Sequence, residues 1–294
     1  MFLSIIIPTF NSAKYIQKCL DSIVSQDFEG IEIIVIDNGS NDFTSDLIEI
    51  NYPQVVLIKN EKNTGSSFAR NQGIKYSSGD YLVFLDSDTY LEKGFLTKLS
   101  QVLENIFKNV AGISSKILNH NLNTIFSCGL RISTLYRIYD VGQGSKKDNF
   151  SECMSIDGLN SCCAIIRRTA IEEIKTNGQY FDEDFFFLFE DVDLSLRLSK
   201  KGNKFLFIPD LICYHLGGGS KYTKDFRRYL CFRNRWYIIL KNNRGRKLGL
   251  FFLRSFFYDL VRTLHFSISN KYFLKAVQDI YNYCKVKREK TINI

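Results

Sequence analysis

The chain has 294 residues, 45% of them hydrophobic, which is enough apolar material for one large domain or for one domain with an appendage. Its eight cysteines include no Cys-x-x-Cys pair, which argues against a zinc site and favours a reduced, cytosolic protein. The net charge of +8 is unevenly divided, because residues 220–294 carry 18 Lys and Arg and only 4 Asp and Glu, whereas residues 1–219 carry 21 and 27.

Strands and helices alternate over the first 88 residues. Short apolar runs predict strands over 2–8, 31–36, 55–58 and 81–85. The first run lacks a basic leader, so it reads as a strand and not as a signal peptide. Helices are expected over 13–25, 44–50 and from Gly65 onward, with Asn11 or Ser12 placed to cap the first. This alternation predicts an α/β fold with a mixed, mostly parallel, Rossmann-like central sheet and helices on both faces.

Past residue 88 the alternation weakens. The pattern predicts further helices over 95–106 and 190–202, the second ending at a Gly202 cap. Strands or extended loops are expected over 111–118, 124–141, 162–166, 204–208 and 211–215.

Two acids end the central apolar strand, at Asp86 and Asp88. Open α/β sheets bind ligands beyond the carboxyl ends of their strands. Paired carboxylates repel each other unless a cation compensates them, and oxygen ligands suit Mg²⁺ or Mn²⁺ arriving with substrate phosphates. The alternative is that both acids simply end a strand in a solvated turn.

Asp37 ends the second strand, beside Asn38 and Ser40, and should therefore lie on the same edge of the sheet. A carboxylate there can accept an N–H from a pyrimidine base, or it can form an Asx-turn. Arg70 and Asn71 lie on a helix after a turn, where Arg70 can contact a nucleotide or pair with a surface acid.

Glu190 and Asp191 open a helix directly after the aromatic run 185–189. Apolar surroundings raise carboxyl pKa values, which suits a general base. Capping of the helix is the alternative interpretation.

His215, one of three histidines, ends a strand before a glycine-rich turn. It is either a Mn²⁺ ligand or an ordinary polar residue.

Six segments together resemble family 2 glycosyltransferases with the GT-A fold. They cover most of residues 1–220, and each is weak alone but specific in this order and spacing. The segments are Ile-Ile-Ile-Pro-Thr-Phe-Asn (5–11), Ile-Asp-Asn-Gly-Ser-Asn-Asp (36–42), Asn-Thr-Gly-Ser-Ser-Phe-Ala-Arg-Asn-Gln-Gly (63–73), Phe-Leu-Asp-Ser-Asp (84–88), Phe-Glu-Asp-Val-Asp-Leu-Ser-Leu-Arg (189–197) and His-Leu-Gly-Gly-Gly-Ser (215–220). The C-terminal pattern looks most like the rhamnosyltransferase-like branch.

The resemblance implies a role for each matching residue. Asp191, with Glu190 beside it, would be the catalytic base, and Asp88 with His215 would bind Mn²⁺ or Mg²⁺ bridging the donor diphosphate. The nucleotide would be held by a larger set: Pro8, Thr9, Asn11, Asp37, Asn38, Ser40, Asn63, Gly65, Arg70, Asn71, Asp86 and Ser87.

One segment departs from the family pattern. Members often have glycine where Ser161 stands, and the segment Asn160, Ser161 and Cys162 borders the sugar and acceptor pocket. The resemblance therefore leaves the donor sugar open. It implies inverting transfer from a nucleotide-diphosphate sugar to a hydroxyl of a glycan or lipid-linked glycan.

Residues 221–294 form a second region, basic and aromatic. The stretch 227–240 mixes arginines with aromatics at helical spacing, and 248–268 is apolar but interrupted by Arg254, Asp259 and Arg262. Charges at mid-bilayer cost about 2.5–3.5 kcal/mol each, so an amphipathic helix on an anionic membrane surface fits better than a membrane span. Plain packing as helices and nucleic-acid binding are the alternatives, and we expect no nucleic acid.

The expected protein is thus a peripheral enzyme at the cytoplasmic face of the membrane, with a GT-A domain over 1–220 and a helical extension over 221–294. Two other classes stay open. A sugar nucleotidyltransferase would carry a lysine-containing phosphate loop near the first strand, and the sequence 8–11 has none. A non-catalytic nucleotide-binding scaffold would lack the acids that this chain keeps.

Overall fold

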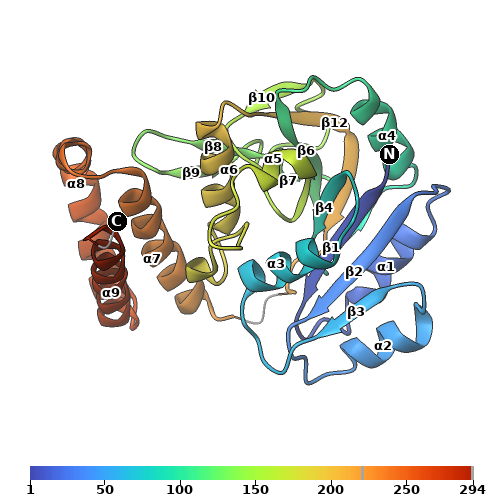
Figure 1. The fold of residues 1–294 in the computed structure, drawn as a ribbon, viewed down its shortest axis with the longest axis horizontal. Helices are drawn as coiled ribbons and strands as arrows, with labels where there is room; N and C mark the ends of the chain where they lie inside the picture. Colours follow the sequence, from blue (N-terminus) through green and yellow to red (C-terminus); the bar gives the residue numbers. More distant parts are fainter. Residues whose placement is uncertain (220–221, 293–294) are drawn as a thin grey trace. The chain divides into compact units, whose positions relative to one another are not determined.

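The computed structural model describes residues 1–219 and 222–292, with side chains described as far as residue 285. The chain forms two compact units (Figure 1). The sheet unit comprises Met1–Arg131, Tyr139–Phe186 and Glu190–Ser220. The helical unit comprises Lys221–Ile294 together with two short segments from earlier in the chain, Ile132–Ile138 and Phe187–Phe189.

A single mixed sheet organises the sheet unit, in the order β10-β12-β6-β11-β4-β1-β2-β3, with β5 beside β12 and β7 beside β6. Strands β1, β2, β3, β4, β6 and β12 run in one direction, and the other four run against them. The bounds are β1 Leu3–Thr9, β2 Ile31–Asp37, β3 Val56–Lys59, β4 Tyr81–Leu85, β5 Thr89–Leu91, β6 Val110–Asn119, β7 Ile125–Ser127, β10 Met154–Ile156, β11 Cys163–Arg167 and β12 Lys204–His215. A separate ribbon pairs β8 Leu130–Ile132 with β9 Ile138–Asp140.

Helices cover both faces of this sheet, because successive residues of each central strand point to opposite sides. In β1, Ile5 and Ile7 join the core under one set of helices, and Ile6 joins the core under the other. The first set is α1 Ile16–Val24, α2 Thr44–Asn51 and α4 Phe95–Glu104. The second set is α3 Ser66–Tyr76, α5 Arg168–Glu172 and α6 Glu190–Lys200. The predicted α/β architecture with a mostly parallel sheet is confirmed.

Three local predictions need correction. The first helix begins at Ile16 and not at residue 13, and neither Asn11 nor Ser12 caps it with a side chain, because residues 12–15 form a turn in which the Ser12 carbonyl accepts the N–H of Ile16. Residues 204–215 are one strand with a bulge, not two. A short strand, β5, also follows Asp88 directly, and its antiparallel pairing sets Thr89 opposite His215.

The helical unit contains α7 Lys224–Asn242, α8 Arg246–Ser269 and α9 Phe273–Ile292. Two adjacent, fully buried residues of α7 hold the two segments taken from earlier in the chain. The Asn234 amide donates to the carbonyls of Phe187 and Leu188, at 2.9 and 2.6 Å. The Arg235 guanidinium donates to the carbonyls of Leu135 and Tyr136, at 2.8 and 3.1 Å, and pairs with Asp259 at 2.7 Å. These two buried side chains therefore hold both earlier segments against α7.

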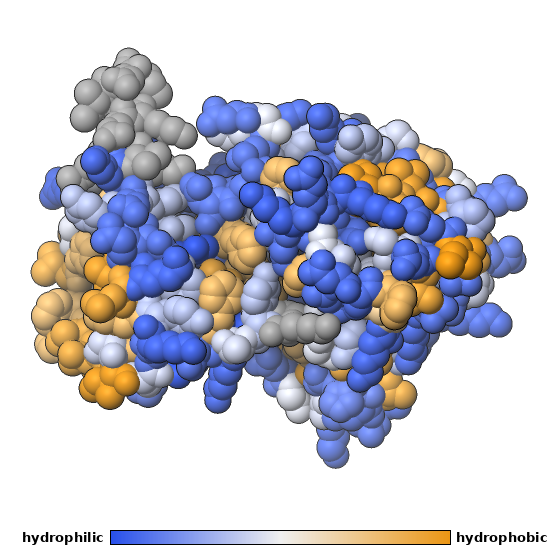
Figure 2. All heavy atoms as spheres, turned by 90° about the horizontal axis from the view of Figure 1, so that it is seen from below, coloured by the Kyte–Doolittle hydropathy of each residue, from blue (hydrophilic) through white to orange (hydrophobic). Residues whose placement is uncertain are grey.

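Apolar side chains are exposed along α8, and hydrophobic residues gather on the helical unit in Figure 2. Those on one stripe of the helix recur every three or four residues: Leu250, Leu253, Phe257, Val261, Leu264 and Ile268. Even so, no helix within residues 1–219 and 222–292 has the length and apolar character needed to span a bilayer.

Candidate active site

Polar residues from four parts of the sheet meet at one edge. Thr9 ends β1 directly opposite Asp37 at the end of β2. Asp86 follows the last residue of β4, and His215 ends β12. Because β1, β2, β4 and β12 run in the same direction, all of these residues lie at carboxyl ends of strands, where open α/β sheets bind ligands. The predicted shared edge for Asp37, Asp86 and Asp88 is confirmed.

Asp88 and His215 form a close pair at this edge. Asp88 Oδ2 lies 3.3 Å from His215 Nε2 and accepts the Gly219 N–H at 2.8 Å. Burial opposes ionisation of Asp88, but the hydrogen bonds from His215 and Gly219 outweigh it and hold the pKa of Asp88 below its ordinary value. The His215 ring packs on Phe126, with centroids 4.4 Å apart. The carboxylate is therefore ionised, and the imidazole is held beside it.

The donor set of this pair fits a divalent cation. Ligands at about 2.1 Å on neighbouring corners of an octahedral site lie about 3 Å apart, close to the separation of Asp88 and His215. A carboxylate and an imidazole together suit Mn²⁺. Among the described residues no group of three His, Cys, Asp or Glu side chains is placed to hold a metal. A cation here would take its remaining ligands from water or from substrate phosphates.

Arg70 lies at the centre of a buried ion network. Its guanidinium donates to Glu190 Oε1 at 2.5 Å and to Asp86 Oδ1 at 2.9 Å. Burial would lower the pKa of Arg70, but the charges of Asp86 and Glu190 outweigh burial and raise it. Burial raises the pKa of Asp86 to about 6, against the opposing charge of Arg70. Arg70 thus links the acid after β4 to the first turn of α6.

Asp191 follows Glu190 in α6, with its carboxylate directed at Ser161. Asp191 Oδ2 accepts the Ser161 N–H at 3.2 Å and lies 3.4 Å from the Ser161 hydroxyl. Burial, followed by the neighbouring charge of Glu190, raises the pKa of Asp191 to about 7. A carboxyl group with a pKa near neutral pH can both accept and release a proton, which is the requirement for a general base. Asp193, by contrast, is buried, and its Oδ2 accepts a hydrogen bond from Arg197 Nε at 2.8 Å, which indicates a structural role.

Asp37 is buried, and its carboxylate forms a serine-rich turn. Asp37 Oδ1 accepts both the N–H and the hydroxyl of Ser40, at 3.1 and 2.5 Å, and Oδ2 accepts the Ser45 hydroxyl. A local turn bonded by the Asp37 side chain, the alternative to base recognition, is therefore present, although Oδ2 keeps a second acceptor site. Ser40 Oγ in turn accepts the Asn11 N–H at 2.8 Å, so Asn11 and Asp37 belong to one cluster with Ser40.

Several other sequence-selected side chains hold backbone or core. Asn38 bonds to the Gly65 carbonyl at 3.0 Å, and the Asn63 side chain accepts the Gly65 N–H at 2.9 Å. Ser87 Oγ lies 2.9 Å from Ser12 Oγ. Three more side chains also bond within the protein. Asn71 bonds to the backbone of 180–181, Asn160 bonds to Asp140, and the thiol of Cys162 bonds to Thr89 in the core.

Sequence reasoning missed some supporting groups. Ser66 donates to Glu190 Oε1 at 2.8 Å, which adds a second donor to the one from Arg70. Gly219 approaches Asp88 so closely that a Cβ would lie 2.7 Å from Oδ2, and Gly65, at φ +89°, would place a Cβ 2.3 Å from the Phe186 carbonyl. The glycines were visible in the sequence, but their neighbours lie more than 100 residues away.

A family model described as glycosyl transferase family 2 matches residues 4–175. A Methanococcus voltae relative, dolichyl N-acetyl-alpha-D-glucosaminyl phosphate 3-beta-D-2,3-diacetamido-2,3-dideoxy-beta-D-glucuronosyltransferase, is 30% identical over 76% of this chain and 68% of its own length. A Campylobacter jejuni relative, GalNAc(5)-diNAcBac-PP-undecaprenol beta-1,3-glucosyltransferase, is 29% identical over 62% of this chain and 57% of its own length. The chain spans much less of other relatives, such as 20% of GlyA from Streptococcus pneumoniae.

Solved structures share the fold. Residues 1–349 of S. aureus TarS in complex with UDP-GlcNAc align with a TM-score of 0.62 at 23% identity, over 96% of this chain and 81% of that one. Mannosyltransferase PcManGT from Pyrobaculum calidifontis, in complex with GDP-Man and Mn²⁺, aligns with a TM-score of 0.58 at 15% identity, over 98% of this chain and 75% of that one. The expected GT-A fold is confirmed. The rhamnosyltransferase-like branch stays a prediction.

Proposed function

Because the chain belongs to glycosyltransferase family 2, we propose that it transfers a sugar, with inversion, from a nucleotide-diphosphate sugar to a hydroxyl of a glycan or lipid-linked glycan. The names of relatives support both halves of this proposal. TarS was solved with UDP-GlcNAc, and the relatives from M. voltae and C. jejuni are named for dolichyl-phosphate and undecaprenol-linked substrates. These names fit a role in cell-surface glycan synthesis.

One observation carries the proposal: a carboxyl group of near-neutral pKa lies next to an ion network that reaches the acidic edge of the sheet. Asp191 adjoins Glu190, Glu190 pairs with Arg70, and Arg70 pairs with Asp86. Asp88 lies two residues further on, paired with His215. The family's catalytic and donor-binding roles thus fall on residues that contact each other in sequence or in space.

In the proposed reaction Asp191 takes the proton from the acceptor hydroxyl as its oxygen attacks the anomeric carbon, and the bond from that carbon to the nucleotide diphosphate breaks. Arg70 bonds to Glu190 and Asp86, whereas the Asp191 carboxylate accepts the Ser161 N–H. A single displacement by an external hydroxyl inverts the configuration. A positioned base of this kind contributes about 10²–10⁴-fold to the rate.

Asp88 and His215 are the residues we propose to hold Mn²⁺ or Mg²⁺. When bound, the cation would neutralise charge on the departing diphosphate. Thr9 and Asp37 are proposed to contact the nucleoside. The Thr9 hydroxyl is buried without a hydrogen-bond partner among the described residues, and buried polar groups are ordinarily paired. A ligand contact at this position would satisfy it.

Peripheral association with the cytoplasmic face of an anionic membrane belongs to the same proposal. Its supports are the basic charge of residues 220–294 and the exposed apolar stripe of α8. Exposed apolar patches on a cationic helix are typical of helices that lie in a membrane interface.

A thermal-shift panel tests the donor site. The full chain would be melted with UDP, GDP, dTDP or CDP, each with Mn²⁺ or EDTA, because a ligand that binds only the native state raises the melting temperature. We expect a rise for one nucleotide that depends on Mn²⁺. If no nucleotide raises the melting temperature, the assignment of this edge as a donor site is overturned.

A further inference from the structure

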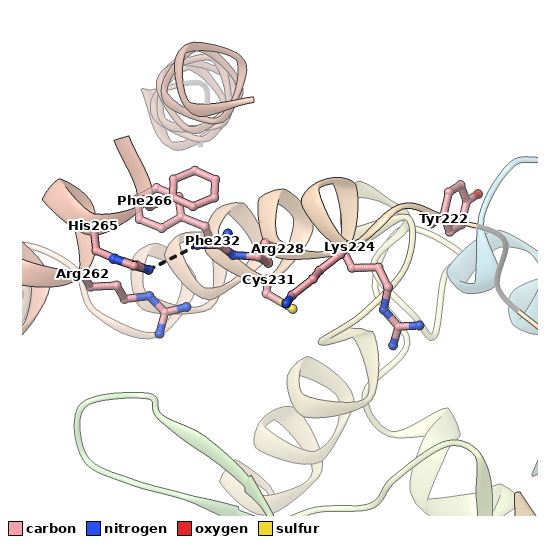
Figure 3. Close-up of a pocket in the computed structure, with 9 residues that line it drawn as sticks. Tyr222, Lys224, Arg228, Cys231, Phe232, Arg262, His265 and Phe266 are labelled. Atoms are coloured by element: carbon pink, nitrogen blue, oxygen red, sulfur yellow. Dashed lines mark hydrogen bonds between the residues drawn. The ribbon is translucent and has the colours of Figure 1, made fainter. Parts of the chain in front are cut away.

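Two helices of the helical unit line a solvent-open cavity of about 700 Å³ (Figure 3). On α7 its lining residues recur every three or four positions, at Lys224, Arg227 and Arg228, with Cys231 and Phe232 one turn later. On α8 they are Arg262, His265 and Phe266, with the same spacing. One face of each helix thus lines the same space, which is the condition for side chains far apart in sequence to act on one ligand.

The cavity concentrates positive charge without matching carboxylates. Lys224, Arg227, Arg228 and Arg262 all line it, and within the part of the chain that the structure describes none of them forms an ion pair with an acid. Other arginines of α7 differ in this respect. Arg235 pairs with Asp259 at 2.7 Å, although it lies only seven residues after Arg228.

Groups other than carboxylates hold two of these cations in place. The Arg228 guanidinium donates to the Ser269 hydroxyl at 2.6 Å and to its carbonyl at 3.3 Å, and lies 3.4 Å from His265 Nε2. Arg262 donates to the Tyr258 hydroxyl at 3.1 Å. Figure 3 shows Arg228 and His265 pointing toward each other across the gap between the helices, with Arg262 beside His265. These two cations are held in place by uncharged groups and stay partly accessible to solvent, so an anionic ligand can reach them.

The cavity also has an aromatic wall. Phe232 of α7 and Phe266 of α8 are buried and stacked, with ring centroids 4.4 Å apart. On α8, Leu264 of the exposed apolar stripe directly precedes His265. Several cations against aromatic rings, next to exposed apolar surface, favour a ligand with an anionic head and an apolar body. Guanidinium groups bind phosphate oxygens through paired hydrogen bonds.

We propose that this cavity binds the phosphate-bearing headgroup of a membrane lipid. The inference rests on the proposed function for its context, since a lipid-linked acceptor and the bilayer around it both present such groups. It adds a defined binding site to what would otherwise be general attraction between a basic surface and an anionic membrane.

The test measures binding of the full chain to vesicles by co-sedimentation. Three compositions separate the sources of the phosphate: phosphatidylcholine alone, phosphatidylcholine with phosphatidylglycerol, and phosphatidylcholine with a polyprenyl diphosphate. Inorganic pyrophosphate is added as a soluble competitor. Stronger binding to the second composition assigns the site to bulk phospholipid, and stronger binding to the third assigns it to an acceptor-type lipid.

The decisive comparison is between two double variants of equal charge. Arg228→Gln with Arg262→Gln alters the cavity, and Arg244→Gln with Arg254→Gln removes two exposed charges outside it. We expect the cavity variant to lose at least about tenfold more vesicle affinity than the control, because it also loses charge-assisted hydrogen bonds. Equal losses in the two variants, or no competition by pyrophosphate, would overturn the proposal.

Two further measurements keep the result interpretable. Circular dichroism checks that the cavity variant is folded, and the single variant Arg262→Gln replaces it if it is not, since Arg262 bonds only to the Tyr258 hydroxyl among the described residues. The nucleotide thermal shift is measured on the same samples. A cavity variant that loses vesicle binding but keeps the nucleotide response supports the cavity proposal, whereas a missing nucleotide response in the wild type counts against the proposed function.

Discussion

Both units of this chain bury charged side chains, but they use them differently. In the sheet unit, Arg70, Asp86 and Glu190 converge on the edge where strands end, beside a carboxyl group whose pKa is raised to about 7. In the helical unit, Arg235 and Asp259 pair inside the bundle, and Arg235 also holds backbone carbonyls of the segment 132–138. The first set of charges adjoins the proposed catalytic base, and the second set holds separate segments of the chain together.

The difference predicts how each set responds to substitution. Carboxyl groups with shifted pKa values cluster at functional sites, and the residues of such sites often lower the stability of the folded protein. A buried pair that fastens a fold behaves in the opposite way, because removal of one partner leaves an uncompensated charge. Substitutions in the sheet edge should therefore change activity more than stability, and substitutions in the helical pair should change stability first.

The largest expected effect is that of Asp191→Asn on turnover. Without a base to take the acceptor proton, kcat should fall by about 10²–10⁴-fold, while the nucleotide still binds. Initial rates of nucleoside-diphosphate release measure the first quantity, and the nucleotide thermal shift measures the second. Asp210→Asn, an exposed acid on β12, is the matched control and should keep the wild-type rate. A near-normal rate in Asp191→Asn would remove Asp191 as the base.

The corresponding substitution in the helical unit is Asp259→Leu. It leaves Arg235 buried without its acid, which should destabilise the helical unit by about 3–5 kcal/mol. The chain's one tryptophan, Trp236, lies on α7, so its fluorescence during urea unfolding reports this unit. The control is Asp157→Leu, which breaks the half-exposed pair with Arg131 in the sheet unit and should cost about 0–1 kcal/mol, measured by circular dichroism during urea unfolding. If both variants lose the same free energy of unfolding, the buried pair is no more important for stability than the half-exposed pair.

A third substitution, Asp88→Ala, separates ligand binding from folding. If Asp88 and His215 hold the cation, the variant should lose the Mn²⁺-dependent nucleotide shift. That shift corresponds to about 2.7 kcal/mol when the ligand is at 100 times its Kd. Asp210→Ala removes an exposed acid and should keep the full shift. An undiminished, Mn²⁺-dependent shift in Asp88→Ala would show that the cation is held elsewhere.

The same contrast appears in what the sequence could predict. Asp37, Asp86, Asp88 and Asp191 could be chosen because each stands in a short contiguous motif at the end of a strand or the start of a helix. The strand β5 was missed because three residues are too few to show a period, and its existence depends on pairing with β12. Local sequence pattern thus singled out the acids of the proposed site but not the strand that sets Thr89 opposite His215.

In the helical unit the sequence was less informative. Asn234 and Arg235 stand in a basic, aromatic stretch that resembles a solvated helix face. Their burial follows from contacts with residues 46 to 100 positions earlier, at Leu135, Tyr136, Phe187 and Leu188. No periodicity in α7 distinguishes an arginine that holds backbone from one that lines a cavity.

The pH dependence of the rate tests the state of Asp191 directly. A base with a pKa of about 7 is protonated and inactive in acid, so kcat should rise with pH and level off above about 7. The stability effect has the opposite sign, since a carboxyl with a raised folded-state pKa loses stability as pH rises from its ordinary value toward 7. Asp191→Asn should therefore gain melting temperature relative to wild type over that range. A rate that is flat from pH 5 to 8 would contradict the assignment.

The smallest expected effect concerns the segment directly before α6. Phe186, Leu188 and Phe189 all have positive φ, at 62°, 67° and 71°, directly before Glu190 and Asp191. Such conformations cost about 1–3 kcal/mol each and persist only where surrounding contacts enforce them. Asn234 supplies two of those contacts, to Phe187 and Leu188. Asn234 thus holds the segment that leads directly into Glu190 and Asp191.

We therefore expect Asn234→Ala to lower kcat by about tenfold, the loss that follows from about 1.4 kcal/mol of misplaced transition-state contact. Donor KM and the nucleotide thermal shift should stay at wild-type values, since the donor-side residues lie on other elements. Asn242→Ala, which removes an amide bonded only within α7 among the described residues, is the control. A loss of stability by Trp236 fluorescence with an unchanged kcat would show that Asn234 fastens the chain without positioning the base, and the contrast between the two units would then be complete.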